Sequence, residues 1–132
     1  MSASARTVLL VDDDPIMLAF LERAVGASYA VVTKADGAAA RDWLLAPEAS
    51  GEGRADLVVA DLQMPGLDGF GFTEAVRADP RTERLPILIL SGSDKSEDRI
   101  RCLRLGADDF VVKPFNPEEL MARIDNLFRR LG

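Results

Sequence analysis

The stretch TVLLVDDDP, from Thr7 to Pro15, decides how this chain folds. It places three aspartates directly after a short run of apolar residues. The run is too continuously apolar to alternate between core and solvent, which favours a strand buried on both faces of a parallel sheet. Asp14 followed by Pro15 is typical of a helix N-cap and a first helical position. Adjacent carboxylates repel one another, so either they are ordinary solvated charges or they bind a group that needs negative charge.

The same alternation of a short apolar run and a longer helical stretch occurs five times along the chain. Five such units predict an α/β fold, a doubly wound five-stranded parallel sheet. The expected strands are TVLLVD, YAVVT, ADLVVAD, LPILILS and DFVVK, and the helices that follow them span about 15–25, 37–45, 69–78, 95–105 and 117–131.

Two further helix starts carry recognisable capping signals. Asn116 and Pro117 repeat the cap-then-proline pattern, and Glu119 is placed for a capping box. Asp94 and Glu97 form a second candidate capping box. These signals predict helices that begin near residues 95 and 117.

We interpret residues 1–132 as a single domain with its core at about 7–131. The length is that of one domain and suffices to bury a core. Segment 46–55, rich in Gly, Pro, Ser and Glu, is expected to be a surface loop. If the chain is complete, the domain works alone; if it was excised from a larger protein, an output domain would be missing.

Composition and charge narrow the classes of function. A net charge of −6 and a pI of about 4.6 argue against direct nucleic-acid binding, which requires a positively charged surface. The chain has no histidine, which excludes His-based triads, His metal sites and a phosphohistidine of its own. Without a membrane-length apolar run or a signal peptide, a cytoplasmic protein with no membrane insertion is expected. Cys102, the only cysteine, is expected to be a buried helix residue.

Polar side chains follow four of the five apolar runs. Asp12 and Asp13 follow the first run, Asp61 the third, Ser91 the fourth and Lys113 the fifth. Ligands bind beyond the carboxyl ends of the strands in an open parallel sheet, so these side chains are expected to meet at one edge. Three carboxylates so near to one another do not all stay ionised without a compensating positive charge. A divalent cation would supply that charge, and oxygen ligands suit Mg²⁺. Carboxylates, a divalent cation, a lysine and a hydroxyl are the parts that phosphoryl transfer needs.

Four motifs, in order, carry a resemblance to a known family. VLLVDDDP, VVADLQMPGLDGFGF, ILILSGS and GADDFVVKPF resemble response-regulator receiver domains, the CheY-like domains of two-component signalling. The resemblance covers about residues 7–131, which is essentially the whole chain. It implies the flavodoxin-like strand order 2-1-3-4-5.

The resemblance implies a phosphoacceptor and a metal site. Asp61 would accept a phosphoryl group and become an aspartyl phosphate. Asp12 and Asp13 would hold Mg²⁺ together with Asp61, with Asp13 the more direct ligand of the acidic pair. The backbone carbonyl of Gln63 would complete the protein's share of the coordination, and Mn²⁺ is the alternative ion.

The resemblance also implies the residues that respond to phosphorylation. Lys113 would bind a phosphoryl oxygen, and its peptide bond to Pro114 is expected to be cis. Ser91 would hydrogen-bond the phosphoryl group and move on activation, and Phe110 would swing inward as the switch aromatic. Serine stands where threonine is frequent in the family, and Phe110 offers no phenolic hydroxyl to a partner.

The implied function is a phosphorylation switch and not an enzyme. A sensor histidine kinase or a histidine phosphotransfer protein would donate the phosphoryl group to Asp61. The face built from the fourth helix, the fifth strand and the fifth helix would then change its affinity for a downstream protein target. The chain is expected to be a monomer, with a dimer on phosphorylation as the alternative.

Two other interpretations stay open. Asp12 and Asp14 match the Asp-x-Asp opening of haloacid-dehalogenase-like phosphatases, as nucleophile and acid/base, but Asp61 would then have no role. The chain could also be a phosphorylation-independent interaction module on the same fold. Asp108 and Asp109 are expected to be solvated loop charges in each case.

Overall fold

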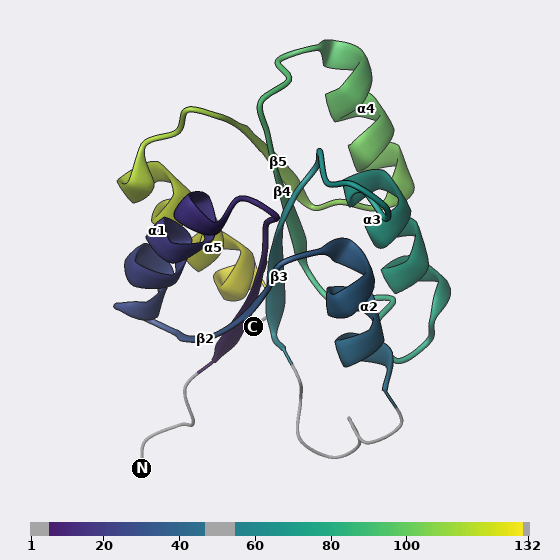
Figure 1. The fold of residues 1–132 in the computed structure, drawn as a ribbon, viewed down its shortest axis with the longest axis horizontal. Helices are drawn as coiled ribbons and strands as arrows, with labels where there is room; N and C mark the ends of the chain where they lie inside the picture. Colours follow the sequence, from purple (N-terminus) through teal and green to yellow (C-terminus); the bar gives the residue numbers. More distant parts are fainter. Residues whose placement is uncertain (1–5, 47–54, 131–132) are drawn as a thin grey trace.

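The computed structural model describes residues 6–46 and 55–130, whose path is shown in Figure 1. Strands and helices alternate along this part of the chain. The strands are β1 (Thr7–Val11), β2 (Ala30–Lys34), β3 (Leu57–Asp61), β4 (Ile87–Ser91) and β5 (Asp109–Val112). The helices are α1 (Pro15–Gly26), α2 (Gly37–Leu45), α3 (Gly69–Ala78), α4 (Ser96–Leu105) and α5 (Pro117–Arg130). Most of the predicted loop, 47–54, and Leu131 at the expected end of the last helix lie outside the described residues.

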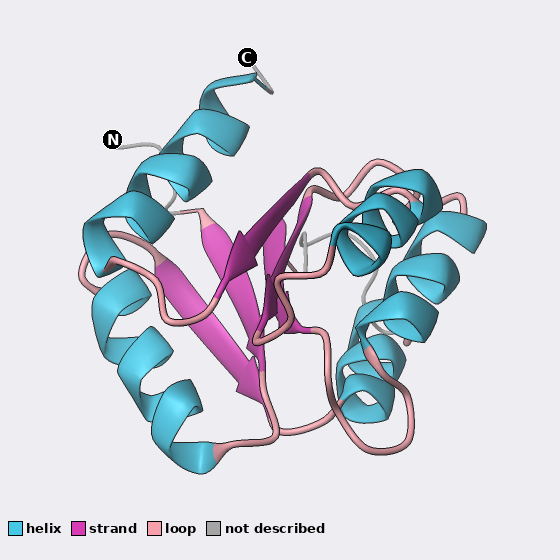
Figure 2. Cartoon of the chain, turned by 90° about the horizontal axis from the view of Figure 1, so that it is seen from above, coloured by secondary structure: helices cyan, strands magenta, loops and turns pink. Residues whose placement is uncertain are grey.

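All five strands pair in parallel in a single sheet, in the order β2-β1-β3-β4-β5. Helices α1 and α5 cover one face, and α2, α3 and α4 cover the other, so that Figure 2 shows three layers from above. The predicted doubly wound fold and its strand order are confirmed. In this order β1 lies beside β3 and β3 beside β4, which brings their carboxyl ends together where the strand order reverses.

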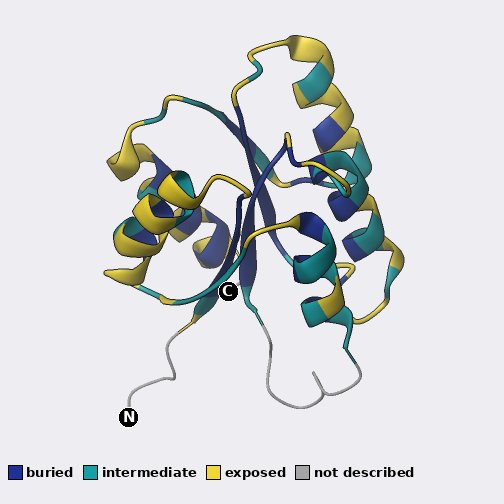
Figure 3. Cartoon of the chain, viewed as in Figure 1, coloured by how far each residue is buried: buried dark blue, intermediate teal, exposed yellow. Residues whose placement is uncertain are grey.

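The central strands supply side chains to two hydrophobic cores. Leu9 and Val11 of β1 pack toward α2, α3 and α4, whereas Val8 and Leu10 pack toward α1 and α5. All four side chains are fully buried, and Figure 3 shows the same burial along the middle of the sheet. Burying one such side chain contributes about 1.5–3 kcal/mol. This two-sided burial explains why the strands read as continuous apolar runs. Cys102 of α4 is also buried, as expected.

The predicted N-caps Asp14 and Asn116 are confirmed, whereas the two predicted capping boxes do not form. Asp14 accepts the backbone N–H of Ile16 at 3.0 Å, and Asn116 accepts that of Glu118 at 2.8 Å. Glu119 forms no capping box, because it accepts two charge-assisted hydrogen bonds from Arg123 one turn on, at 2.9 and 3.1 Å.

The capping box expected from Asp94 and Glu97 is also absent. Helix α4 begins at Ser96, so its N-cap is Lys95, which makes no side-chain cap hydrogen bond. Asp94 therefore lies one residue too early to cap the helix. The hydroxyl of Ser93 accepts the Lys95 N–H at 3.2 Å instead.

Asp108 is an exposed loop residue, as the sequence indicated, but it is paired with other groups, whereas Asp109 is a half-buried strand residue and not a loop charge. Asp108 accepts the backbone N–H of Ile87 at 2.8 Å and pairs with Arg77 at 3.0 Å. Asp109 begins β5 and binds the Arg123 guanidinium through both carboxylate oxygens, at 3.0 and 3.1 Å. Their partners lie 14 to 31 residues away along the chain, a separation that local pattern reading does not cover.

Candidate functional site: an acidic cluster at the strand ends

Three carboxylates meet where β1 and β3 end. One carboxylate oxygen from each of Asp12, Asp13 and Asp61 lies within 4.8 Å of the other two. Asp12 is fully buried and Asp61 is 5 % exposed, whereas Asp13 faces solvent. Among the described residues this is the group of acidic side chains placed to hold a metal ion. Its all-oxygen donor set and its opening to water through Asp13 suit a hard cation that keeps some of its waters, such as Mg²⁺.

Lys113 reaches the same cluster from the end of β5. Its ammonium nitrogen lies 2.9 Å from Asp61 Oδ1 and 3.4 Å from Asp12 Oδ2. Burial raises the pKa of the Asp61 carboxyl above its usual range, although the hydrogen bond from Lys113 opposes this shift. Burial lowers the pKa of Lys113, but hydrogen bonding to Asp61 and the charges of both carboxylates outweigh it, so that pKa is raised.

The three consecutive aspartates have different environments. Asp12 Oδ1 accepts the backbone N–H of Asp14 at 2.9 Å, which fixes the turn that leaves β1. Asp14 turns its own side chain to the start of α1, where it accepts the Ile16 N–H. Asp13 faces solvent beside the two buried carboxylates. Two of the three consecutive aspartates thus belong to the cluster, and the third caps a helix.

Close backbone packing fixes the turn that follows Asp61. The N–H of Gly69 donates to the carbonyl of Leu62 at 2.8 Å. A Cβ at Gly69 would lie only 2.8 Å from Leu62 Cα and 3.0 Å from the Asp61 carbonyl oxygen, which is closer than side chains tolerate. Gly66 in the same loop has φ +78°, a conformation that favours glycine. The loop thus needs glycine at two positions to hold Asp61 at the strand end.

Of the two predicted switch residues, Ser91 lies at the end of β4, next to β3, and Phe110 lies near the start of β5. Ser91 is fully buried at the end of β4, and its hydroxyl donates to the side-chain Oε1 of Gln63 at 3.3 Å. Phe110 is 7 % exposed and packs in the core that contains Ile89. Lys113 donates its backbone N–H to the Ser91 carbonyl at 2.7 Å, and its bond to Pro114 is cis, as expected.

Two contacts of Ser93 beside this site were not predicted from the sequence. Ser93 donates its backbone N–H to the Ser91 hydroxyl at 2.9 Å, and its own hydroxyl donates to Asp98 at 2.7 Å. The spacing Ser-x-Ser after a buried strand is the only local signal for the first contact. The second contact depends on where α4 begins, which the sequence placed too early.

Comparison with known proteins assigns the chain to a family. Residues 8–125 match the response regulator receiver domain. The chain belongs to the response regulator receiver domain family. The matched segment begins in β1 and ends in α5, so it includes every residue of the acidic cluster. Proteins of this family act as signalling modules.

Curated relatives of this receiver domain are transcriptional regulators. It is 40 % identical to the transcriptional regulatory protein GltR of Pseudomonas aeruginosa over 131 residues, which are 98 % of the chain and 52 % of GltR. It is 42 % identical to the transcriptional regulatory protein PrrA of Mycobacterium tuberculosis over 126 residues, 95 % of the chain and 51 % of PrrA. The chain thus spans about half the length of these relatives.

Solved structures share the fold of this receiver domain. The chemotaxis protein CheY4 of Vibrio cholerae superposes with a TM-score of 0.81 at 32 % identity, over 93 % of this chain and 98 % of CheY4. The receiver domain of the sensor histidine kinase PA1611 of Pseudomonas aeruginosa gives 0.78 at 30 % identity, over 93 % of this chain and 97 % of that one. The PA1611 domain carries a magnesium ion in its active-site cleft.

Within residues 6–46 and 55–130, no helix is long and apolar enough to cross a membrane.

Proposed function

We propose that this receiver domain accepts a phosphoryl group on Asp61 in a Mg²⁺-dependent reaction and thereby changes its affinity for a protein partner. The observation that carries the proposal is the meeting of Asp61 with two further carboxylates and the Lys113 ammonium at one sheet edge. Family membership supports the same function.

Each residue of the cluster has a role in the proposed transfer. A carboxylate oxygen of Asp61 forms a bond to phosphorus while the bond from phosphorus to the donor's leaving atom breaks. Lys113 binds one phosphoryl oxygen and orients the group. Asp12, Asp13 and Asp61, with the backbone carbonyl of Gln63, would hold Mg²⁺, or Mn²⁺ in its place. The bound cation supplies positive charge that lets the anionic phosphoryl group approach the carboxylates.

The phosphoryl donor is a sensor histidine kinase or a histidine phosphotransfer protein. The chain has no histidine of its own to carry the group. Beside the acidic cluster, α1 exposes Ile16 at 80 % and Phe20 at 42 %, and Phe20 contacts Phe115 at 6.1 Å between ring centres. Large apolar side chains exposed together favour a protein contact, so this surface supports docking of the donor close to Asp61.

The response is proposed to reach a downstream protein through the face of α4, β5 and α5. Ser91 would move toward the phosphoryl group, and Phe110 would follow it. On α4, Ile100 and Leu103 are each 45 % exposed, which leaves apolar surface for a partner on this face. The same surface would serve for a second copy of the chain if phosphorylation causes dimerisation.

Intact-mass spectrometry after incubation with Mg²⁺ and acetyl phosphate tests the proposal. Wild type should gain one phosphoryl group, and EDTA should prevent the gain. Asp61→Asn should gain none, whereas the control Asp42→Asn, at an exposed carboxylate on α2, should behave as wild type. Equal labelling of Asp61→Asn would refute the assignment. Absence of both an adduct and beryllofluoride binding in wild type would favour the phosphorylation-independent module.

The phosphatase alternative is not favoured. It needs the Asp14 carboxylate as acid/base, but that carboxylate caps α1 by accepting the Ile16 N–H. It also leaves the Asp61–Lys113 contact without a purpose. We therefore expect no turnover of generic phosphate esters, which a chromogenic phosphatase assay with wild type would check.

A further inference from the structure

The hydroxyl of Ser91 is held from two sides in this structure. It donates to Gln63 Oε1 at 3.3 Å and accepts the backbone N–H of Ser93 at 2.9 Å. Because Ser91 is fully buried, water does not replace either partner. A displacement of the Ser91 hydroxyl therefore acts on the backbone of the loop between β4 and α4.

Ser93 extends this contact into the first turn of α4. Its hydroxyl donates to Asp98 Oδ2 at 2.7 Å and accepts the Lys95 N–H at 3.2 Å. Asp98 is one of the two acidic residues in that turn. One residue thus bonds the Ser91 hydroxyl through its backbone and the helix through its side chain. A shift of Ser93 reaches both.

The start of helix α4 is held by weaker hydrogen bonds than the starts of the other four helices. Its first backbone hydrogen bond, from Arg99 to Lys95, is 3.3 Å long, whereas the corresponding bonds of the others are 2.8 to 3.1 Å. Of its ten residues, only Cys102 is buried. It also lacks the side-chain cap that begins each of the others, from Asp14, Asp36, Asp68 and Asn116. The bond from Ser93 to Asp98 is therefore a side-chain contact that ties the first turn of α4 to the loop before it, in a helix without a side-chain cap.

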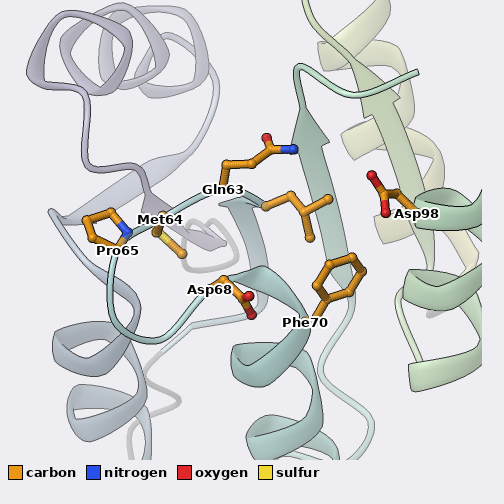
Figure 4. A pocket seen from close by; sticks show the side chains of 7 residues that line it. Gln63, Met64, Pro65, Asp68, Phe70 and Asp98 are labelled. Carbon is orange, nitrogen blue, oxygen red and sulfur yellow. The ribbon is translucent and has the colours of Figure 1, made fainter. Parts of the chain in front are cut away.

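A hollow of about 420 Å³ lies beside this first turn. Figure 4 shows Gln63 and Phe70 on one side of it and Asp98 on the other. The next contact along α4 is the Arg101 guanidinium, 3.9 Å from the centre of the Phe70 ring. The hollow gives the first turn of α4 room to move without a clash at that side.

From these contacts we infer that Ser93 and Asp98 are positioning residues that carry the state of Ser91 to α4. The inference rests on the proposed function. A phosphoryl oxygen on Asp61 is a stronger acceptor than the Gln63 amide, so it draws the Ser91 hydroxyl away from Gln63. Ser93 follows through its backbone N–H, and its hydroxyl draws Asp98 and the first turn of α4 along.

Coupling of this kind is reciprocal, which gives it two signatures. Part of the free energy gained when the phosphoryl group binds the Ser91 hydroxyl is spent on moving α4. Removing the Ser93–Asp98 hydrogen bond should therefore leave α4 in place when Ser91 moves. It should also let Ser91 move toward the phosphoryl group at a lower cost in free energy. The expected gain in affinity for a phosphoryl mimic is about fivefold, the effect of one net hydrogen bond. A merely structural role for Asp98 would not raise that affinity.

Backbone-amide NMR of the ¹⁵N-labelled chain, titrated with beryllofluoride and Mg²⁺, tests the inference. In wild type the amides of 91–93 and 96–99 should shift together. In Asp98→Ala and Ser93→Ala the shifts of 91–93 should persist, those of 96–99 should be largely lost, and the beryllofluoride Kd should fall. Ser93→Thr keeps the hydroxyl and should keep the wild-type response.

Glu97→Ala is the matched control, because it removes the same charge from the same turn at an exposed position. It should leave both readouts unchanged. Wild-type shifts of 96–99 in both Asp98→Ala and Ser93→Ala would overturn the coupling and leave the phosphorylation site standing. Failure of wild type to respond to beryllofluoride at any of these amides would overturn both proposals.

Discussion

The ammonium of Lys113 lies 2.9 Å from the Asp61 carboxylate, and this contact joins the ends of β5 and β3. The Lys113 side chain is 22 % exposed and that of Asp61 is 7 % exposed, so water screens the pair poorly. Asp12 lies 3.4 Å from the same ammonium. Lys113 therefore offsets part of the negative charge of the cluster before any divalent cation binds, and it repels a cation that does.

Lys113→Met should lower the stability of the metal-free domain and raise its affinity for Mg²⁺. Removing one partner of a buried ion pair costs about 3 kcal/mol. Mg²⁺ should bind roughly tenfold tighter, because a repulsion of about 1.4 kcal/mol is lost. Urea denaturation with and without MgCl₂, and calorimetric titration, measure the two effects. Lys95→Met, at an exposed lysine, is the control. An unchanged Mg²⁺ affinity in Lys113→Met would contradict this prediction.

Arg77 should be one of the most stabilising polar side chains. From α3 it donates to the carbonyls of Leu85 at 2.6 Å and Gly106 at 3.0 Å, and it pairs with Asp108. Arg77→Met should lower the free energy of unfolding by about 3 kcal/mol, because these acceptors lose their partner. Chemical denaturation followed by circular dichroism measures the loss. The exposed Arg81→Met is the control and should unfold like wild type, and equal losses in the two variants would refute the role of Arg77.

The fold could be predicted from the sequence because the same pattern, a short apolar run followed by a helical stretch, recurs along the chain. Each of the three central strands is buried on both faces, so each reads as a continuous apolar run. Asp12, Asp61 and Lys113 could be placed at one edge because parallel strands all end on the same side of a sheet. For these residues, local pattern and general topology together suffice.

Contacts between distant segments explain what the sequence did not predict. Asp108 looks like a loop charge until Arg77, 31 residues away, is brought beside it. The Ser93–Asp98 bond depends on α4 beginning at Ser96, and helix ends are the least certain part of a pattern. The side-chain contact of Gln63 with Ser91 needs the β3–β4 register, which no local motif encodes.

Two buried threonines should respond oppositely to the same substitution. Among the described residues, the Thr73 hydroxyl is the buried side-chain polar group without a hydrogen-bond partner. The hydroxyl of Thr82 is also buried, but it donates to the Val76 carbonyl at 2.7 Å. Thr73→Val should stabilise the domain by about 1 kcal/mol, and Thr82→Val should destabilise it by about 1 kcal/mol. Urea denaturation of both variants measures the difference. Destabilisation of similar size in both would mean that the Thr73 hydroxyl is satisfied in solution.

Tyr29 should make the stability depend on pH above pH 10. Burial raises the pKa of Tyr29 from 10.0 to about 12, and the hydrogen bond that its hydroxyl donates to Asp125 acts in the same direction. The folded state thus favours the neutral phenol, so this contribution is complete below pH 10 and is lost as the pH rises toward 12. Tyr29 is the only tyrosine, so its ultraviolet absorbance gives the titration directly.

The Tyr29→Phe variant separates this contribution from other groups that titrate in the same range. Burial raises the pKa of the Cys102 thiol to about 11, so wild type should lose stability for more than one reason. The difference in unfolding free energy between wild type and Tyr29→Phe removes the common part, and it should shrink between pH 10 and 12. Asp125→Ala should lower the phenol midpoint, because it removes both the acceptor and its negative charge. A midpoint near 10 in the folded wild type would show that the Tyr29–Asp125 contact does not hold the phenol neutral.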